Sequence, residues 1–325
     1  MGKARKILRR LRTVENIHAI TRAMYIVSTA RFKQAYDRLN HSRPYIRGVL
    51  DLAAQVSADR PEGVPLHPLQ KVRPAGPPDV LVVLASRRGL CSSYNYNVVR
   101  AAQQRLAELR QGGGKALLRC SGKRGQFILE TLGEEIAHSY VTADRAPDAA
   151  SARALADGLM GEFLRGDIHG VEVAYTQFLS ASRQKPAVRR LLPLEGLPAA
   201  PASRRDGPAL RSLGEGGSPA ALGAAPAGAP AARPADAAMP PYYIPSRPAV
   251  LEELVPHAVR TSLYQCFLEA FASEQVARMT AMRSASDNAE DLMHDLTVRH
   301  NRARQAQITT ELAEIMGGRQ GIEEL

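Results

Sequence analysis

Long stretches near both ends of the chain carry hydrophobic residues at helical spacing. Apolar positions recur every three or four residues over residues 3–57, and the pattern is almost unbroken over residues 251–318. Such spacing predicts amphipathic helices, which at these lengths would reach roughly 80 and 100 Å. We expect Pro44 to bend or restart the first helix, and Gly317-Gly318 to end the second. The first stripe consists of Val14, Ile17, Ile20, Met24, Val27 and Ala30. The second consists of Leu268, Ala272, Gln275, Met279, Met282, Ala289, Leu292, Leu296, Ile308, Leu312 and Ile315.

Between these helices the hydrophobic period changes. Val80–Leu84 is a short, continuous apolar run typical of a buried strand. Three further strands are predicted, alternating with helices, which indicates a small, mostly parallel α/β domain of Rossmann-like type. The further strands are expected over 116–120, 171–178 and 187–193, and the helices over about 95–111, 122–133 and 147–165.

Composition divides the chain into five parts. A Pro-rich segment separates the first helix from the α/β domain, and an Ala/Pro/Gly-rich segment without hydrophobic period separates that domain from the last helix. Low-complexity sequence of this kind is typical of an insertion that adds nothing to a core. The boundaries are 1–60 for the N-terminal coiled-coil helix, 61–78 for a linker, 79–196 for the α/β domain, 197–247 for the insertion and linker, and 248–325 for the C-terminal coiled-coil helix.

Charge distribution suggests how the two helices are arranged. Residues 1–60 hold 13 Lys/Arg against 4 Asp/Glu, and residues 250–325 hold 7 against 12, so their formal charges are +9 and −5. Opposite charge and narrow stripes favour an antiparallel coiled coil. The predicted fold is therefore α/β plus a long antiparallel coiled coil, in which the two terminal helices form a shaft and the α/β domain is inserted between them.

Candidate catalytic chemistry is sparse. Gly112-Gly113-Gly114-Lys115 lacks the spacing and the Ser or Thr of a phosphate loop, and Ser121–Gly125 is better explained as a tight strand-to-helix turn than as an anion cradle. Cys91 has no local partner signature, so we expect a buried structural thiol. The three cysteines and eight histidines show no ligand spacing, and we expect no metal and no cofactor.

Several blocks of sequence, in order, resemble the gamma subunit of F-type ATP synthases over nearly the whole chain apart from the insertion. Val14–Met24 is similar to the family's N-terminal helix, Ser86–Asn95 to the loop after its first strand, and Gln184–Leu194 to the end of its α/β domain. Ser262–Gln265, Ala272–Gln275, Arg278–Met279 and Asn301–Thr309 are similar to its C-terminal helix.

The resemblance implies a shaft that rotates inside a ring of alternating alpha and beta subunits. The foot of the shaft would contact the epsilon subunit and the membrane c-ring. The chain would be present in one copy, without a catalytic site of its own, and peripheral to the cytoplasmic face of a bacterial cell membrane. The implied contacts with catalytic-subunit loops are Arg304, Gln305, Thr309, Arg278 and Met24, joined by the N-terminal cations Arg9 and Arg10.

The chain departs from the family pattern in the loop after the first strand. Arg87 stands where the family has Asp, and Ser92-Ser93 replace a Gly-Gly pair, which restricts the dihedral angles of that turn. The 197–241 insertion lacks cysteine, which excludes a thiol switch there. Two other classes stay open on the residues alone. One is a basic coiled-coil protein that binds nucleic acid, and the other is an α/β enzyme with helical arms and a convergent polar pocket in residues 79–195.

Overall fold

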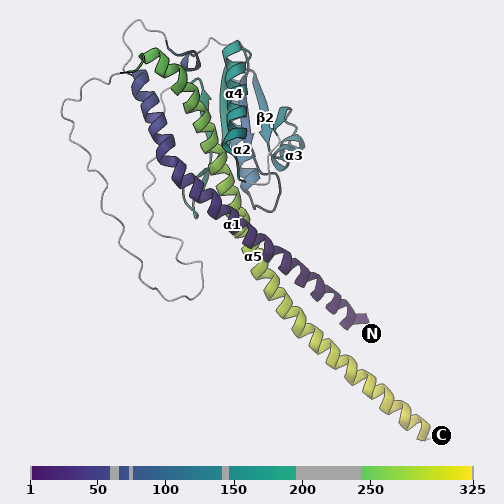
Figure 1. Cartoon of the computed structure of the whole chain (residues 1–325). Helices are drawn as coiled ribbons and strands as arrows, with labels where there is room; N and C mark the ends of the chain where they lie inside the picture. Colours follow the sequence, from purple (N-terminus) through teal and green to yellow (C-terminus); the bar gives the residue numbers. More distant parts are fainter. Residues whose placement is uncertain (1, 59–65, 73–75, 141–145, 195–242, 324–325) are drawn as a thin grey trace, which may run out of the picture.

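The computed structural model describes residues 2–58, 66–72, 76–140, 146–194 and 243–323, and the predicted 197–241 insertion lies outside these residues. Two long helices, α1 (Gly2–Ala58) and α5 (Arg247–Glu323), lie against each other in opposite directions. Their far ends project from a mixed α/β domain as a rod (Figure 1). The predicted combination of an antiparallel two-helix shaft with an inserted α/β domain is therefore confirmed.

The sheet of the domain has five strands in the order β3-β2-β1-β4-β5. The first four pair in parallel, and β5 is antiparallel to β4. Predicted strands and helices agree with the structure within a few residues, except that β3 was not predicted. Its sequence, IAHSY, lies at an edge with three exposed residues and lacks the apolar run of a central strand. The elements are β1 (Asp79–Leu84), α2 (Tyr94–Gln111), β2 (Ala116–Ser121), α3 (Lys123–Thr131), β3 (Ile136–Tyr140), α4 (Ala149–Arg165), β4 (Gly170–Phe178) and β5 (Gln184–Leu192), with a 3-10 turn, η1, over Pro68–Gln70.

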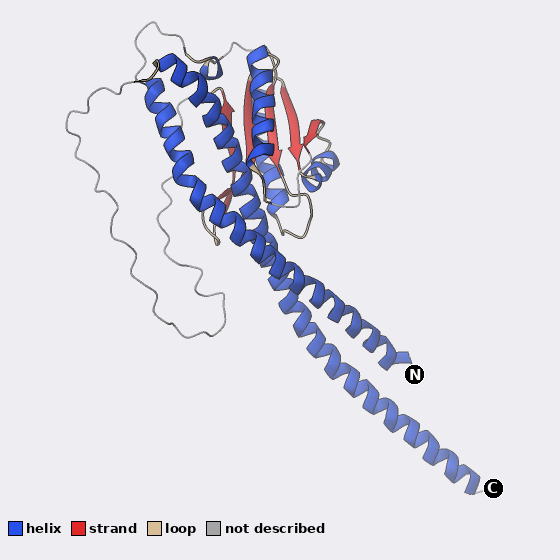
Figure 2. Ribbon diagram, viewed as in Figure 1, coloured by secondary structure: helices blue, strands red, loops and turns tan. Residues whose placement is uncertain are grey.

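Helices cover both faces of the sheet (Figure 2). Successive strand residues point to opposite faces, so Val80 and Val82 of β1 pack in the cluster that contains α4 and α5, whereas Leu81 and Val83 pack against α2. The base of α5 lies along β4, and Val259 belongs to the same buried cluster as Val173. The shaft is thus continuous with the domain core.

The seam of the shaft does not follow the predicted apolar stripe of α1. The positions that face α5 are Val14, Thr21, Ser28 and Ala35, which repeat every seventh residue, a spacing typical of a left-handed coiled coil. The Thr21 hydroxyl donates to the carbonyl oxygen of His18 at 3.0 Å, which lowers the cost of its burial. The expectation that Ile17, Ile20 and Val27 form the contact with α5 was wrong. In a coiled coil the contact positions recur every 3.5 residues on average, and these three large apolar residues do not fall on that repeat.

The predicted apolar stripe of α5 agrees better with the residues that the structure buries. Leu268, Ala272, Gln275, Met282, Ala289 and Leu296 of α5 are buried, whereas Met279 is partly exposed and Leu292 is exposed. Farther along the helix, Ile308 and Leu312 are exposed, because α5 extends past the start of α1.

Neither long helix is interrupted at the predicted point, and the alternative that Pro44 bends α1 stays a prediction. Pro44 lies inside α1 without restarting it, and α5 runs through Gly317-Gly318 to Glu323. A glycine in a helix interior costs only about 1 kcal/mol relative to alanine. No proline follows in the sequence to force a stop.

Candidate functional site

One flank of α1, beside its seam with α5, exposes a row of large apolar side chains. Ile17, Ile20 and Val27 are 48%, 59% and 49% exposed, and neighbouring Ile26 is 59% exposed. Residues three or four positions apart share one side of a helix, so Ile17, Ile20, Met24 and Val27 form one surface, which we term the outer stripe. Contiguous exposed apolar surface of this kind is typical of a protein interface.

The free end of α5 carries the predicted contact residues Arg304, Gln305 and Thr309. All three side chains are exposed. Their helix extends beyond the N-terminal end of α1 (Figure 1), where the seam ends with Leu296 packed near Ile7 and Leu11. This overhang presents all sides of a single helix, including the exposed Leu312.

The predicted cations at the start of α1 also face outward. Arg9 and Arg10 are exposed on the shaft, and the Arg9 carbonyl oxygen accepts a hydrogen bond from the Thr13 hydroxyl at 3.1 Å. They lie on the half of the shaft that projects away from the domain. The structure therefore places Arg9, Arg10, Arg304 and Gln305 toward the same end of the rod.

Met24 and Arg278 meet where the shaft joins the domain. They line one cavity of about 240 Å³ together with Arg87 and Arg88. Met24 is partly exposed, but Arg278 is only 6% exposed. We term this region the junction cavity.

Arg278 is bound within the chain. Its Nη2 donates to the carbonyl oxygens of Arg88 at 3.1 Å and Gly89 at 3.3 Å, and the same nitrogen lies 2.7 Å from the Glu274 carboxylate. A guanidinium used in this way fixes the turn after β1 against α5. The structure therefore gives Arg278 internal contacts that the sequence did not predict.

The turn after β1 is organised by Asn95. Its side chain accepts from the Ser86 amide at 2.9 Å and donates to the Ser86 hydroxyl at 2.7 Å and to the Cys91 sulfur at 3.2 Å. Burial raises the pKa of the Cys91 thiol, which is 1% exposed. A thiol that is buried and protonated is a poor nucleophile, and the predicted structural role of Cys91 fits this environment.

The same turn contains two residues with left-handed backbone. Leu90 has φ 62° and Ser92 has φ 51°. L-residues adopt this region at a cost, which glycine does not incur. Ser92, which the resemblance sets against a glycine of the family, therefore strains the turn.

The glycine-containing segments form turns. Gly122 has φ 108°, and a Cβ there would lie 2.3 Å from the Ala85 carbonyl oxygen, so Ser121–Gly125 is the tight strand-to-helix connection predicted. Gly112–Gly114 follow α2, and Gly113 has φ 75°. Across the described ranges, His, Cys, Asp and Glu side chains nowhere gather in threes in a way that could hold a metal ion.

Comparison with known proteins decides the family. The ATP synthase family model matches residues 3–322. A protein of Rhodopirellula baltica named ATP synthase gamma chain is 34% identical over 99% of this chain and 100% of its own length. A protein of the same name from Gemmatimonas aurantiaca is 34% identical over 98% of both chains. The chain belongs to the ATP synthase gamma chain family.

Solved structures of distant proteins share the fold of this gamma chain. A chain of the Euglena gracilis mitochondrial ATP synthase rotor is 16% identical, with a TM-score of 0.59, and the match covers 94% of this chain and 99% of that chain. A second structure from the same organism, of an assembly with the c-ring, gives a TM-score of 0.61 at 16% identity, with 99% and 95% coverage. The shaft-and-domain architecture is thus retained at low sequence identity.

Proposed function

We propose that this gamma chain is the rotating central stalk of an F-type ATP synthase. It couples transmembrane proton flow to ATP synthesis and hydrolysis in the catalytic subunits. The observation that carries the proposal is the outer stripe, Ile17 to Val27, on a rod whose seam with α5 is already filled by other residues. Such a stripe needs a surrounding protein surface, and a ring of alternating alpha and beta subunits would supply one.

Coupling by a shaft requires that each angle of rotation stabilise a different set of catalytic-site conformations. An asymmetric rod does this through differential contacts with the subunits around it. The exposed residues Arg304, Gln305 and Thr309 on the overhang, with Arg9 and Arg10 on α1, would contact loops of the catalytic subunits. Acidic loops would complement the basic start of α1.

The remaining partners follow from this assignment. The α/β domain would form the foot of the stalk and contact the epsilon subunit and the membrane c-ring. One copy would serve each complex, peripheral to the cytoplasmic face of the bacterial cell membrane, without nucleic acid, cofactor or metal. Within the part of the chain that the structure describes, no helix combines the length and hydrophobicity of a membrane span.

Met24 and Arg278 have different proposed roles. Met24 is partly exposed and continues the outer stripe, so it would contact the catalytic subunit directly. Arg278 would act through the turn that it holds at Arg88 and Gly89. Arg278 would therefore position the turn that borders the junction cavity and would not contact the catalytic subunit itself.

The first test is co-purification of the chain with the native membrane ATPase. The proposal expects one copy per complex, and absence of the chain from that complex would overturn it. The second test replaces Arg304 and Gln305 together by Ala in the assembled complex. We expect weakened coupling or turnover with normal assembly, and unchanged ATP synthesis and hydrolysis would contradict their role. Arg299→Ala is the control, because Arg299 is an exposed arginine of the same helix, with 65% of its side chain accessible, and is not among the proposed contacts.

A further inference from the structure

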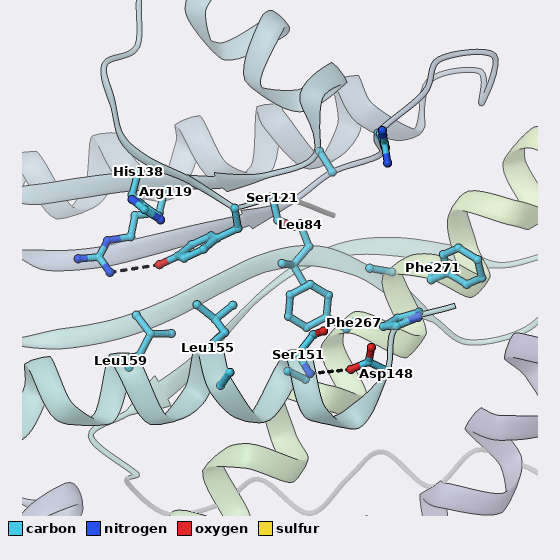
Figure 3. Close-up of a pocket in the computed structure, with 18 of the residues that line it drawn as sticks. Leu84, Arg119, Ser121, His138, Asp148, Ser151, Leu155, Leu159, Phe267 and Phe271 are labelled. Carbon is cyan, nitrogen blue, oxygen red and sulfur yellow. Dashed lines mark hydrogen bonds between the residues drawn. The ribbon is translucent and has the colours of Figure 1, made fainter. Parts of the chain in front are cut away.

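A second, larger cavity lies between the α/β domain and the shaft. Its volume is about 870 Å³, within the range of roughly 300–1,000 Å³ of small-molecule sites. Figure 3 shows its walls: Leu155 and Leu159 from α4, Phe267 and Phe271 from α5, and Arg119 and His138 from the sheet. None of these residues belongs to the outer stripe or to the overhang.

The position of the cavity matches the usual place for a ligand in an open parallel sheet. Leu84, Ser121 and Tyr140 line it, and they are the last residues of β1, β2 and β3. The switch in strand order lies between β1 and β4, and the strand residues that line the cavity come from β1, β2 and β3 next to it. Ligands of open α/β sheets bind beyond the carboxyl ends of the strands at such a switch.

Rings and aliphatic side chains dominate the lining. Phe267 and Phe271 are partly exposed although they are large apolar residues of the central part of α5. His138 and Tyr140 stand edge to face, with ring centroids 4.7 Å apart. Flat faces of this kind favour a ligand that itself contains a ring.

Four of the five Arg, Asp and Glu residues of the lining have polar partners inside the chain that are described below, and the fifth, Arg87, is exposed. Arg119 donates to both Glu162 oxygens, at 2.9 and 2.5 Å, and to the Tyr140 hydroxyl at 3.2 Å. Asp148 accepts from the Ser151 amide at 2.6 Å, and Glu274 pairs with Arg278. A charged ligand would lose hydration without gaining a dedicated counter-charge, so the cavity favours a neutral molecule.

We propose that this cavity binds a neutral, ring-bearing small molecule. The hydroxyls of Ser121 and Ser151 and the His138 imidazole lie in the lining and supply hydrogen-bonding groups for polar substituents on the ring. Phe271 and Glu274 line both this cavity and the junction cavity. A ligand bound at that end of the cavity would touch Glu274, which pairs with Arg278. This inference stands on the lining alone and does not depend on the proposed rotary function.

Gly158 provides a sharp test. It lines the cavity, and a Cβ added there meets no atom within 4 Å. Because Gly158 is an exposed residue of the lining, Gly158→Trp would place an indole over the open side of the cavity and obstruct it, whereas Gly158→Ala would leave it open and favour the helix. Ala154→Trp is a second obstructing variant on the same exposed side of α4, in case the first does not fold.

The experiment titrates Nile red, a neutral aromatic dye whose fluorescence rises in apolar sites, into the purified full chain. We expect saturable binding in the wild type and a Kd at least about tenfold higher in both tryptophan variants. Gly158→Ala and Ile20→Gln should retain wild-type binding, the second showing that the dye does not report on the outer stripe.

Three results would overturn the proposal. One is the absence of saturable binding, and another is equal binding by the tryptophan variants and the wild type. The third would come from the assembled complex. If Gly158→Trp affects dye binding only in the isolated chain, then a partner protein, not a small molecule, fills the cavity.

Discussion

The guanidinium of Arg278 donates to the carbonyl oxygen of Arg88 at 3.1 Å and so joins α5 to the turn after β1. The two residues are 190 positions apart in the sequence. A second link lies nearby, where the Tyr94 hydroxyl donates to the Ala270 carbonyl oxygen at 3.1 Å. Shaft and domain are therefore connected by specific polar contacts as well as by apolar packing.

Arg278→Ala should destabilise the isolated chain by about 2–3 kcal/mol, because it leaves two carbonyl oxygens and the largely buried Glu274 without this partner. Arg278→Lys should recover only part of the loss, since a single ammonium cannot reproduce the forked contacts. Urea-induced unfolding measures the effect. Arg283→Ala is the control, an exposed arginine on the same helix. A wild-type midpoint for Arg278→Ala would mean that the residue acts only on a partner.

The left-handed backbone conformation of Ser92 predicts a substitution that raises stability. Ser92→Gly should stabilise the chain by about 1 kcal/mol, because glycine adopts φ 51° without the steric cost of a Cβ. Ser93 is the matched control, since its φ of −79° suits any L-residue. Ser93→Gly should therefore bring no gain. Thermal unfolding of the two variants distinguishes relief of backbone strain from a general effect of glycine in this turn.

Two buried glutamates should respond differently to removal of charge. Glu269 is 2% exposed, and burial raises the pKa of its carboxyl group above its ordinary value. Glu172 is 5% exposed, but Arg105 donates to both of its oxygens at 2.6 and 2.8 Å. Loss of hydration is thus the main effect on the Glu269 carboxyl group, whereas the forked ion pair with Arg105 is the main effect on Glu172.

The raised pKa of Glu269 fixes the sign of its pH dependence. Above about pH 4.5 the unfolded chain loses this proton before the folded chain does, so the free energy of unfolding falls with pH until the folded group titrates. Glu269→Gln should remove that fall and raise stability at neutral pH, whereas Glu172→Gln should cost about 1–2 kcal/mol. Urea unfolding between pH 4 and pH 8 tests both. A larger loss of stability at pH 8 for Glu269→Gln than for Glu172→Gln would contradict the argument.

Much of the architecture could be predicted from periodicity, because long helices and buried strands leave strong local signals. The edge strand β3 left none, since IAHSY alternates without a continuous apolar run. The seam of α1 was misassigned because the largest apolar residues, such as Ile20, face outward, while Thr21 and Ser28 face α5. Hydrophobicity alone does not distinguish a surface that packs within the chain from one that packs against another protein.

The candidate site was predictable only in part, because the sequence identifies exposed residues but not the contacts that form across the fold. The resemblance identifies Arg304 as a contact residue, and its side chain is exposed in the structure. The internal role of Arg278 depends on a contact with Gly89 across the fold, and no local pattern in the sequence encodes it. The cavity beside Phe267 likewise arises from elements that are distant in the chain, namely α2, α4, α5 and the strands β1, β2 and β3.

The outer stripe gives the final prediction. Ile20→Gln should leave the stability of the isolated chain within about 0.5 kcal/mol of the wild type, because Ile20 is 59% exposed there. In the complex the buried isoleucine would contribute about 1.5–3 kcal/mol, so assembly should weaken by about tenfold or more.

Reconstitution of ATPase activity against gamma-chain concentration measures this shift. The reconstitution uses alpha and beta subunits alone, so the proposed foot contacts with the epsilon subunit and the c-ring do not contribute. Leu164→Ser is then the control, a leucine of α4 with similar exposure, 49%, away from the outer stripe. It should leave the reconstitution curve in place. Equal curves for Ile20→Gln and the wild type would show that the stripe is not part of the interface. A loss of stability in the isolated Ile20→Gln chain would instead show that Ile20 packs within the shaft.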